Sequence, residues 1–340
     1  MKTYSTLALE AIRACHSGDT EAGVQKYREA LAAPDGFSLP VGLHTALLES
    51  AGRHEAAAAI QTAGMVLGLD LSTCWWARKG DPKAAVTEYQ GLFAKGIGTP
   101  CMVEHYLEAL SVVGDSEMLA REAAPETLFR EVQVPEAIQP LMAEGAAELR
   151  HASSRHFEDN RRSIRAMDRV LEAHRLTVPG VMAVHSAVAD LVRQYLDDVR
   201  QSGHLIAQWL PSEFVLRSWG VISDGSGGYN APHTHSGCWT VAVAYLEGED
   251  PRAAGRGEQG MLRIGPSEGG DPNCAGWPNL SVAPTPGTVV IMPGFYTHWT
   301  MPVHDGGGRV SLAFNIIPRL SSQNPNSGLN EIAAEQAPHS

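Results

Sequence analysis

The chain has 340 residues, 44% of them hydrophobic, and a formal net charge of −12 at pH 7. This length predicts two or more domains, and the composition is that of an ordinary globular protein. The negative charge argues against a general binder of nucleic acid or of anionic membranes. No apolar run approaches the ~20 residues of a membrane span, and Glu10 interrupts any signal-peptide core. We therefore expect a cytoplasmic protein with no nucleic-acid or membrane partner.

The five cysteines are scattered and form no Cys-x-x-Cys pair. An odd number without a spacing pattern fits a reducing compartment and provides no zinc-ligand motif. Cysteine usage thus also favours the cytoplasm.

Residues 1–137 are rich in alanine and leucine, and a glycine followed by aspartate or arginine recurs at Gly18, Gly52, Gly80 and Gly114. Apolar residues follow the glycines at helical offsets, and each glycine would end the preceding helix. A period of roughly 34 residues resembles the tetratricopeptide repeat. We interpret this region as degenerate helical repeats, with a plain helical bundle as the alternative. Such repeats would offer a face to a protein partner or to a second copy of the chain.

Residues 138–210 are expected to form further helices that pack on the domain after them. Apolar residues recur there at three- and four-residue spacing in 141–150, 164–175 and 183–199. The tail, 321–340, is expected to be disordered.

The composition changes near residue 211, where glycine and proline become frequent and short strand-like runs appear. These runs are residues 214–222, 240–246, 261–264, 288–292 and 309–317. Several short strands separated by turn residues indicate a β-sandwich or barrel. We therefore expect an α+β multidomain chain, with α-helical repeats followed by a β-barrel at residues 211–320.

Two histidines, His233 and His235, are two residues apart in a Pro-His-Thr-His segment. In an extended segment both imidazoles lie on one face, where two neutral nitrogen donors suit a transition metal. Alone this pair is a weak signal, because loop histidines beside a glycine-rich turn look the same. A third donor would come from downstream, either His298, at the end of a predicted strand, or His304, in a glycine-rich turn. We interpret His304 as an exposed loop residue.

The last predicted strand begins Arg-Val-Ser at Arg309 and Ser311. Both side chains lie on one face, whereas the alternate positions are apolar. A strand that turns an arginine and a serine toward a core needs an anion there. A guanidinium with an adjacent hydroxyl suits a carboxylate.

The order of these elements (His-x-His, a strand containing Tyr-Leu, a further His, then Arg-x-Ser) resembles the iron(II)/2-oxoglutarate-dependent oxygenases. It is most similar to the prolyl-hydroxylase branch and to a bacterial oxygenase family, over residues 214–319. The resemblance implies a double-stranded β-helix, also called a jelly-roll or cupin-like barrel. It also implies Fe(II) as the metal, with 2-oxoglutarate and O2 as cosubstrates.

Matched residue by residue, the resemblance implies that His233 and His298 ligate the iron. It further implies that Arg309, Ser311 and Tyr245 hold the far carboxylate of 2-oxoglutarate. The expected reaction is hydroxylation of a C–H bond in a peptide, a protein or a small molecule, and no side-chain acid or base is needed.

His235 departs from the family pattern, because it stands where relatives have an aspartate or glutamate. It could ligate the metal itself, which strand geometry favours, or lie beside a metal held by two histidines and water. A loop carboxylate, Glu247 or Asp224, is the third interpretation. Imidazole also binds copper and zinc, so the departure bears on which metal is used.

Two other functions compete with this reading. A three-histidine site is also compatible with a metal-dependent oxygenase that does not use 2-oxoglutarate. A non-catalytic adaptor, with binding repeats and a degenerate barrel, is the other alternative.

Overall fold

The structure is a computed structural model. It describes positions 7, 10, 14, 19, 22, 25, 26 and 29 and residues 81–318, except 95, 97, 99, 153–155, 158–163, 166, 236–237, 266–276, 278 and 305–307. The chain divides into two compact units, one of residues 1–109 with 319–340 and a second of residues 110–318. Most of the expected repeat region, including Gly18, Gly52 and Gly80, and the tail at 321–340 lie outside the described residues.

The first unit contains α6 (Pro82–Phe93) and the larger part of α7 (Pro100–Val113). Three buried rings pack together there, and the centroids of Phe93 and Tyr106 are 5.3 Å apart in an edge-to-face arrangement. The described residues do not test the repeat assignment, which stays a prediction. Within the described part of the chain, every helix is too short or too polar to span a lipid bilayer.

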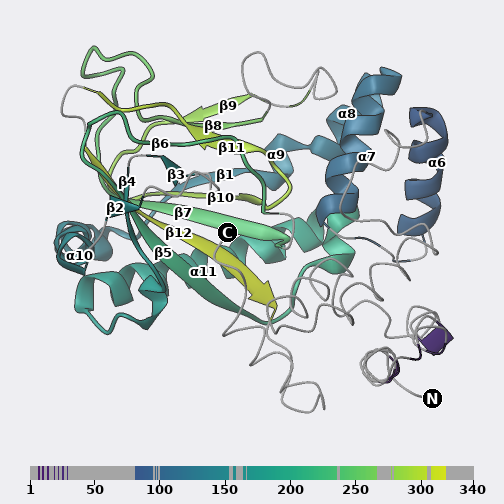
Figure 1. The fold of residues 1–340 in the computed structure, drawn as a ribbon, viewed down its shortest axis with the longest axis horizontal. Helices are drawn as coiled ribbons and strands as arrows, with labels where there is room; N and C mark the ends of the chain where they lie inside the picture. The colour runs from purple at the N-terminus through teal and green to yellow at the C-terminus, as the bar shows by residue number, and fades with distance from the viewer. Residues whose placement is uncertain are drawn as a thin grey trace. The chain divides into compact units, whose positions relative to one another are not determined.

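The second unit is built around a large antiparallel sheet (Figure 1). Its strand order is β1 (Arg130–Gln133), β10 (Thr288–Pro293), β7 (Thr240–Glu247), β12 (Arg309–Pro318), β5 (Phe214–Ser223), β4 (Met167–Val170) and β2 (His156–Phe157). A smaller sheet has the order β11 (His298–Thr300), β8 (Leu262–Ile264) and β9 (Leu280–Val282), and β3 (Ile164–Arg165) pairs with β6 (Tyr229–Asn230). The five strand runs expected after residue 211 are confirmed to within one residue at each end.

Helices cover one face of the large sheet. The helices of this unit are α8 (Ser116–Ala123), α9 (Pro125–Leu128), α10 (Gln139–Ala152), α11 (Pro179–Ser202) and the 3-10 helices η1 (Glu136–Ile138), η2 (Ala173–Arg175) and η3 (Leu205–Trp209). Two of them, α10 and α11, cross so closely that a Cβ on Gly180 would lie 2.4 Å from the nitrogen of Gly145. Glycine is therefore required at this crossing, which holds the helices against the sheet.

The central strand β12 separates two environments by its alternation. Leu312 and Phe314 are fully buried on the helix-covered face, where the Phe314 ring meets His185 of α11. Arg309 and Ser311 point to the opposite face, where Arg309 contacts Thr300 of the smaller sheet. We call this second face the inner face, and every site residue from the large sheet lies on it.

The expectation of a helix at residues 164–175 is wrong. These residues form β3, β4 and η2, and β4 pairs with β5 through residues 168–170. Met167 and Val170 are buried, as the helical spacing suggested, but pairing with the sheet overrides local propensity. The short strand β1 likewise lies within the region expected to be helical and pairs with β10.

Burial of His185 between helix and sheet predicts a loss of stability in acid. Its Nε2 lies 2.7 Å from Ser218 Oγ, and burial lowers its pKa from 6.5 to about 4. In the unfolded chain His185 becomes protonated below about pH 6.5, whereas in the folded chain it becomes protonated only below about pH 4. The free energy of unfolding therefore falls as pH falls through this window. We expect this residue to account for a loss of about 2 kcal/mol between pH 7 and pH 5.

Urea unfolding at both pH values, in the parent and in His185→Gln, measures this contribution. The variant should lose less stability than the parent on acidification, whereas a His151→Gln control, changed at an exposed histidine, should behave like the parent. Equal pH dependence in all three proteins would contradict the prediction.

Candidate metal centre

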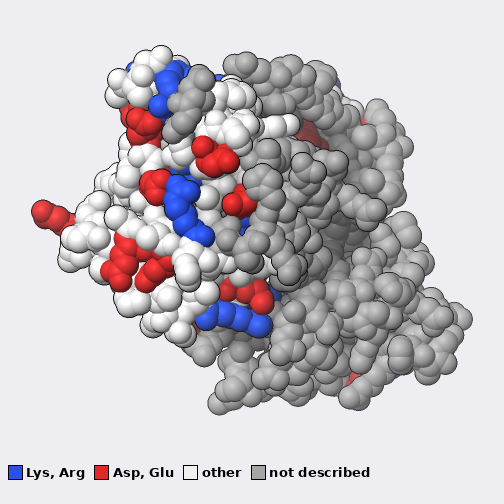
Figure 2. All heavy atoms as spheres, turned by 60° about the vertical axis from the view of Figure 1, so that its left-hand side comes forward, with Lys and Arg blue, Asp and Glu red and all other residues white. Residues whose placement is uncertain are grey.

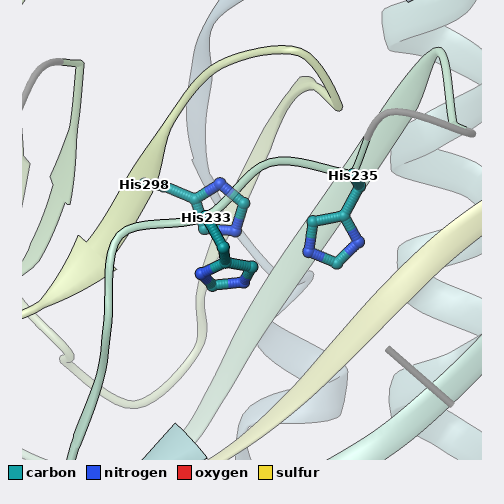
Figure 3. Close-up of side chains that lie close together, drawn as sticks. All are labelled: His233, His235 and His298. Atoms are coloured by element: carbon teal, nitrogen blue, oxygen red, sulfur yellow. The ribbon is translucent and has the colours of Figure 1, made fainter. Parts of the chain in front are cut away.

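Three histidines from two segments of the chain meet on the inner face. His298 begins β11, and His233 pairs with it in an isolated antiparallel bridge whose two backbone hydrogen bonds measure 3.1 and 3.0 Å. His235 follows two residues later, and its ring centroid lies 5.2 Å from that of His233, close together as the spacing predicted. One nitrogen from each imidazole lies within 4.8 Å of the others, and Figure 3 shows the three side chains gathered in one place. His304 is exposed and lies outside this group.

Hydrogen bonds at Nδ1 determine which nitrogen each imidazole offers. His233 Nδ1 lies 2.8 Å from the carbonyl oxygen of Ala231, and His298 Nδ1 lies 2.9 Å from that of Tyr296. His235 Nδ1 lies 2.8 Å from Asn315 Oδ1. Because these oxygens accept, each Nδ1 donates its hydrogen, and the lone pair left for a metal is on Nε2.

Burial keeps the three imidazoles neutral. The pKa of His235 is lowered to about 3, mainly by burial and to a smaller extent by the nearby His233. Burial lowers the pKa of His233 and places the pKa of His298 well below its usual value. Metal ligation requires unprotonated imidazole, so the group is ready to bind at neutral pH.

The two carboxylates considered as a third ligand are engaged elsewhere, and one of them, Glu247, ends β7 and is not a loop residue as expected. Glu247 forms an ion pair with Arg150 at 2.5 Å, and Asp224 accepts a hydrogen bond from the backbone of Ser226 at 2.9 Å. Neither belongs to the histidine group found among the described residues. The arrangement therefore favours His235 as the third donor.

The ring of Trp219 stacks on the imidazole of His235. The indole of Trp219 lies parallel to its imidazole, with centroids 5.9 Å apart and an interplanar angle of 11°. The guanidinium of Arg169 lies over the Trp219 ring, 5.2 Å from its centroid. Together with Asn315, these contacts fix the imidazole plane.

Arg309 is a buried cation without a carboxylate partner among the described residues. The residue is 2% exposed, and it donates to Gly260 O at 2.9 Å, to Thr300 Oγ1 at 2.7 Å and to Met167 Sδ at 3.6 Å. Burial lowers its pKa. Because an isolated buried charge is costly, a guanidinium held only by neutral acceptors indicates a place for an anion.

Unmet hydrogen-bonding groups surround this cation. The hydroxyl of Tyr245 is buried and makes no hydrogen bond with any described residue; burial raises its pKa to about 12, while Arg309 lowers it. Ser311 lies directly opposite Tyr245 in the strand register, and Ser223, whose buried hydroxyl is also unpartnered in the described structure, lies opposite Arg309. One cation with two unpartnered hydroxyls nearby fits a carboxylate.

Several ion pairs connect residues of the segment between Glu249 and Arg263, which contains Gly260. Between β7 and β8, Glu258 pairs with Arg252 at 3.1 Å and with Arg263 at 3.0 Å, and Arg256 pairs with Glu249. Figure 2 shows one face of the molecule, on which basic and acidic side chains lie beside one another. These pairs connect residues of the segment around Gly260, and each exposed pair contributes at most about 1 kcal/mol.

The sequence interpretation missed several of these residues. Asn315 continues the alternation that identified Arg309 and Ser311, so its position could have been predicted. Arg169 could not, because its strand was expected to be a helix. Thr300 follows His298 by two residues and shows no independent signal.

The half-buried to buried group of three histidines could hold a metal ion, and Arg309 near it could bind an anion. Residues 217–315 match the family model described as "Putative 2OG-Fe(II) oxygenase". The matched segment is less than a third of the chain and contains every site residue named in the sequence interpretation. Such oxygenases use Fe(II), 2-oxoglutarate and O2, and the histidine group offers a place for the metal. No curated protein matches the chain.

Solved structures of two prolyl hydroxylases and of an epimerase are similar to part of the chain. A prolyl-4-hydroxylase from Pseudomonas putida is 20% identical, with a TM-score of 0.39, over 59% of this chain and 98% of its own. A prolyl hydroxylase from Trichoplax adhaerens, in complex with a hypoxia inducible factor peptide, is 12% identical, with a TM-score of 0.43, over 61% and 92%. The epimerase SnoN, in complex with Fe3+, alpha ketoglutarate and nogalamycin RO, is 15% identical, with a TM-score of 0.43, over 64% and 90%. At these values none identifies a reaction or a substrate for this chain.

Proposed function

We propose that the second unit is a 2-oxoglutarate-dependent oxygenase built on a double-stranded β-helix. The observation that carries the proposal is the convergence of three neutral imidazoles, each with Nδ1 engaged and Nε2 left for a metal. The proposed metal ligands are His233, His235 and His298, and the proposed 2-oxoglutarate residues are Arg309, Ser311 and Tyr245. The expected outcome is hydroxylation of a C–H bond in a peptide, protein or small-molecule substrate.

Each group of the chain has a defined task in this function. Iron with 2-oxoglutarate and O2 supplies the oxidising chemistry, in which one oxygen atom enters the substrate and the other enters succinate, with release of CO2. The imidazoles hold the metal without taking up protons. Arg309 neutralises the far carboxylate of the cosubstrate, and the hydroxyls of Ser311 and Tyr245 orient it. No side chain of the site needs to act as an acid or base.

A second candidate is a metal-dependent oxygenase that does not use 2-oxoglutarate. The presence of His235 in place of a carboxylate favours it, since imidazole-only sites suit several metals. The unpaired Arg309 favours 2-oxoglutarate, because it gives a dicarboxylate a buried partner. The dependence of cosubstrate binding on Arg309 separates the two.

Turnover of 2-oxoglutarate tests the proposed function. The purified chain should convert 2-oxoglutarate to succinate only when both Fe(II) and O2 are present. His304→Ala, changed at an exposed histidine, should retain this conversion, and His298→Ala should lose it. Succinate formation at equal rates in both variants would contradict the proposal.

Replacement of Asn315 is expected to weaken metal binding although this residue is not a proposed ligand. Asn315→Leu keeps the side-chain size but removes the acceptor for His235 Nδ1, so Fe(II) affinity should fall about 10- to 100-fold. Asn315→Asp retains an acceptor and should stay near the parent. Competition with a coloured chelator measures both affinities, and equal values for the leucine and aspartate variants would show that the contact does not position His235.

A further inference from the structure

The paired strands β5 and β12 form a row of side chains that runs from a buried end to an exposed end. The cross-strand pairs on the inner face are Ser223–Arg309, Val221–Ser311, Trp219–Ala313, Arg217–Asn315 and Val215–Ile317. Ser223 is fully buried, whereas Val215 is 40% exposed. The histidines meet the row through Trp219 and Asn315. The two pairs beyond them lead toward solvent.

Arg217 is the first charged residue on the solvent side of the metal centre. It is partly buried, and it forms no hydrogen bond or ion pair with any described residue. The nearby carboxylate of Glu172 raises the pKa of Arg217, but it is already paired with Arg175 at 3.2 Å. Neither β5 nor β12 contains an acidic residue, so nothing in these two strands neutralises the charge.

The metal centre adds to this positive charge. A triad of two histidines and one carboxylate offsets part of the charge of a divalent ion, but three neutral imidazoles offset none. Arg169 places a further cation on the Trp219 stack. A bound 2-oxoglutarate dianion supplies two negative charges against the three positive charges of a divalent ion and Arg309, so the surroundings of Arg217 stay positive and attract a second anion.

We propose that Arg217 binds a carboxylate of the compound that is oxidised, and that Val215 and Ile317 contact the apolar part of that compound. The inference rests on the proposed function, because it takes the bound compound to be the oxygenase substrate. A guanidinium engages a carboxylate through two parallel hydrogen bonds, which fixes the orientation of the bound molecule as well as its affinity. The substrate class is therefore a carboxylic acid with an apolar body.

This anion site is distinct from the one at Arg309. Residues 217 and 223, the positions opposite Asn315 and Arg309, are six strand residues apart, or about 20 Å along an extended chain. A five-carbon diacid held by Arg309 at the buried end cannot also engage Arg217. The two arginines thus serve two different anions.

Calorimetric titration of the full chain, loaded with Fe(II) and 2-oxoglutarate without oxygen, tests the proposal. The probes are 3-phenylpropionate and its neutral amide, and the acid should bind at least about tenfold more tightly. Arg217→Gln should weaken acid binding about 10- to 100-fold, the usual range for loss of a charged hydrogen-bond partner, and leave amide binding unchanged. Arg217→Lys should retain part of the acid affinity.

Arg193→Gln is the control, since it removes an exposed positive charge on α11 that is paired with Asp190, and it should leave both probes unaffected. A second pair of probes is the peptide Ala-Ala-Phe with a free or an amidated C-terminus, which shows whether the carboxylate can come from the end of a peptide. The proposal is supported if binding of 3-phenylpropionate or of the free peptide depends on Arg217. It is overturned if acid and amide bind equally, if no probe binds, or if Arg217→Gln binds the acids as the parent does. Binding of 2-oxoglutarate is measured in the same samples, so its absence identifies a failure of the proposed function separately.

Discussion

Replacing either His233 or His298 by alanine is expected to lower Fe(II) affinity by about a hundredfold or more, because the binding free energy of a protein metal site, about 10–16 kcal/mol for structural zinc, is shared among few ligands. Both imidazoles are held by a carbonyl two residues earlier, so each loss removes an oriented donor. Chelator competition and metal analysis of the purified variants measure the effect.

The His304→Ala control should bind iron as the parent does. Circular dichroism must show that all three variants fold, since a histidine within the paired strands also makes packing contacts. Full iron content in folded His233→Ala and His298→Ala would remove these residues from the metal site.

Replacing Arg309 by methionine is expected to weaken 2-oxoglutarate binding by roughly 100- to several thousandfold, which corresponds to the ~3–5 kcal/mol of a buried carboxylate left without its partner. Iron affinity should change little, since Arg309 belongs to the buried end of the row and not to the histidine group. Stability without ligands should change by no more than about 1 kcal/mol, because loss of the hydrogen bonds of Arg309 is offset by removal of a buried cation that has no carboxylate partner.

Titration of 2-oxoglutarate into iron-loaded protein measures the first effect, and thermal unfolding measures the second. Arg309→Lys retains the charge but cannot form a bidentate contact with a carboxylate, so its 2-oxoglutarate affinity should lie between those of the parent and Arg309→Met. Unchanged 2-oxoglutarate affinity in Arg309→Met would favour the oxygenase that uses another cosubstrate. A large loss of stability would indicate a structural role instead.

Much of the site could be predicted because strand alternation is simple. His233 and His235 share a face by spacing alone, and Arg309 with Ser311 stands out against an apolar strand. The order of these residues in the chain then indicated a family, and the structure brings the three histidines together as expected. Asn315 obeys the same alternation but was missed, because a polar residue near a strand end has many ordinary explanations.

Other features depend on contacts between distant segments, which local patterns do not encode. Residues 164–175 have helical spacing, yet β4 forms because β5 offers an edge to pair with. The stack of Arg169 on Trp219 follows from that pairing, so it could not be foreseen. The identity of the third ligand also depended on where Glu247 and Asp224 lie, which only the fold determines.

Anaerobic titration of 2-oxoglutarate into the Fe(II)-loaded chain tests the central claim most directly. The account predicts that one equivalent of iron binds and that one equivalent of 2-oxoglutarate then produces a visible charge-transfer band, which is absent without iron and in His298→Ala. Binding of iron with no band and no measurable 2-oxoglutarate affinity would contradict it.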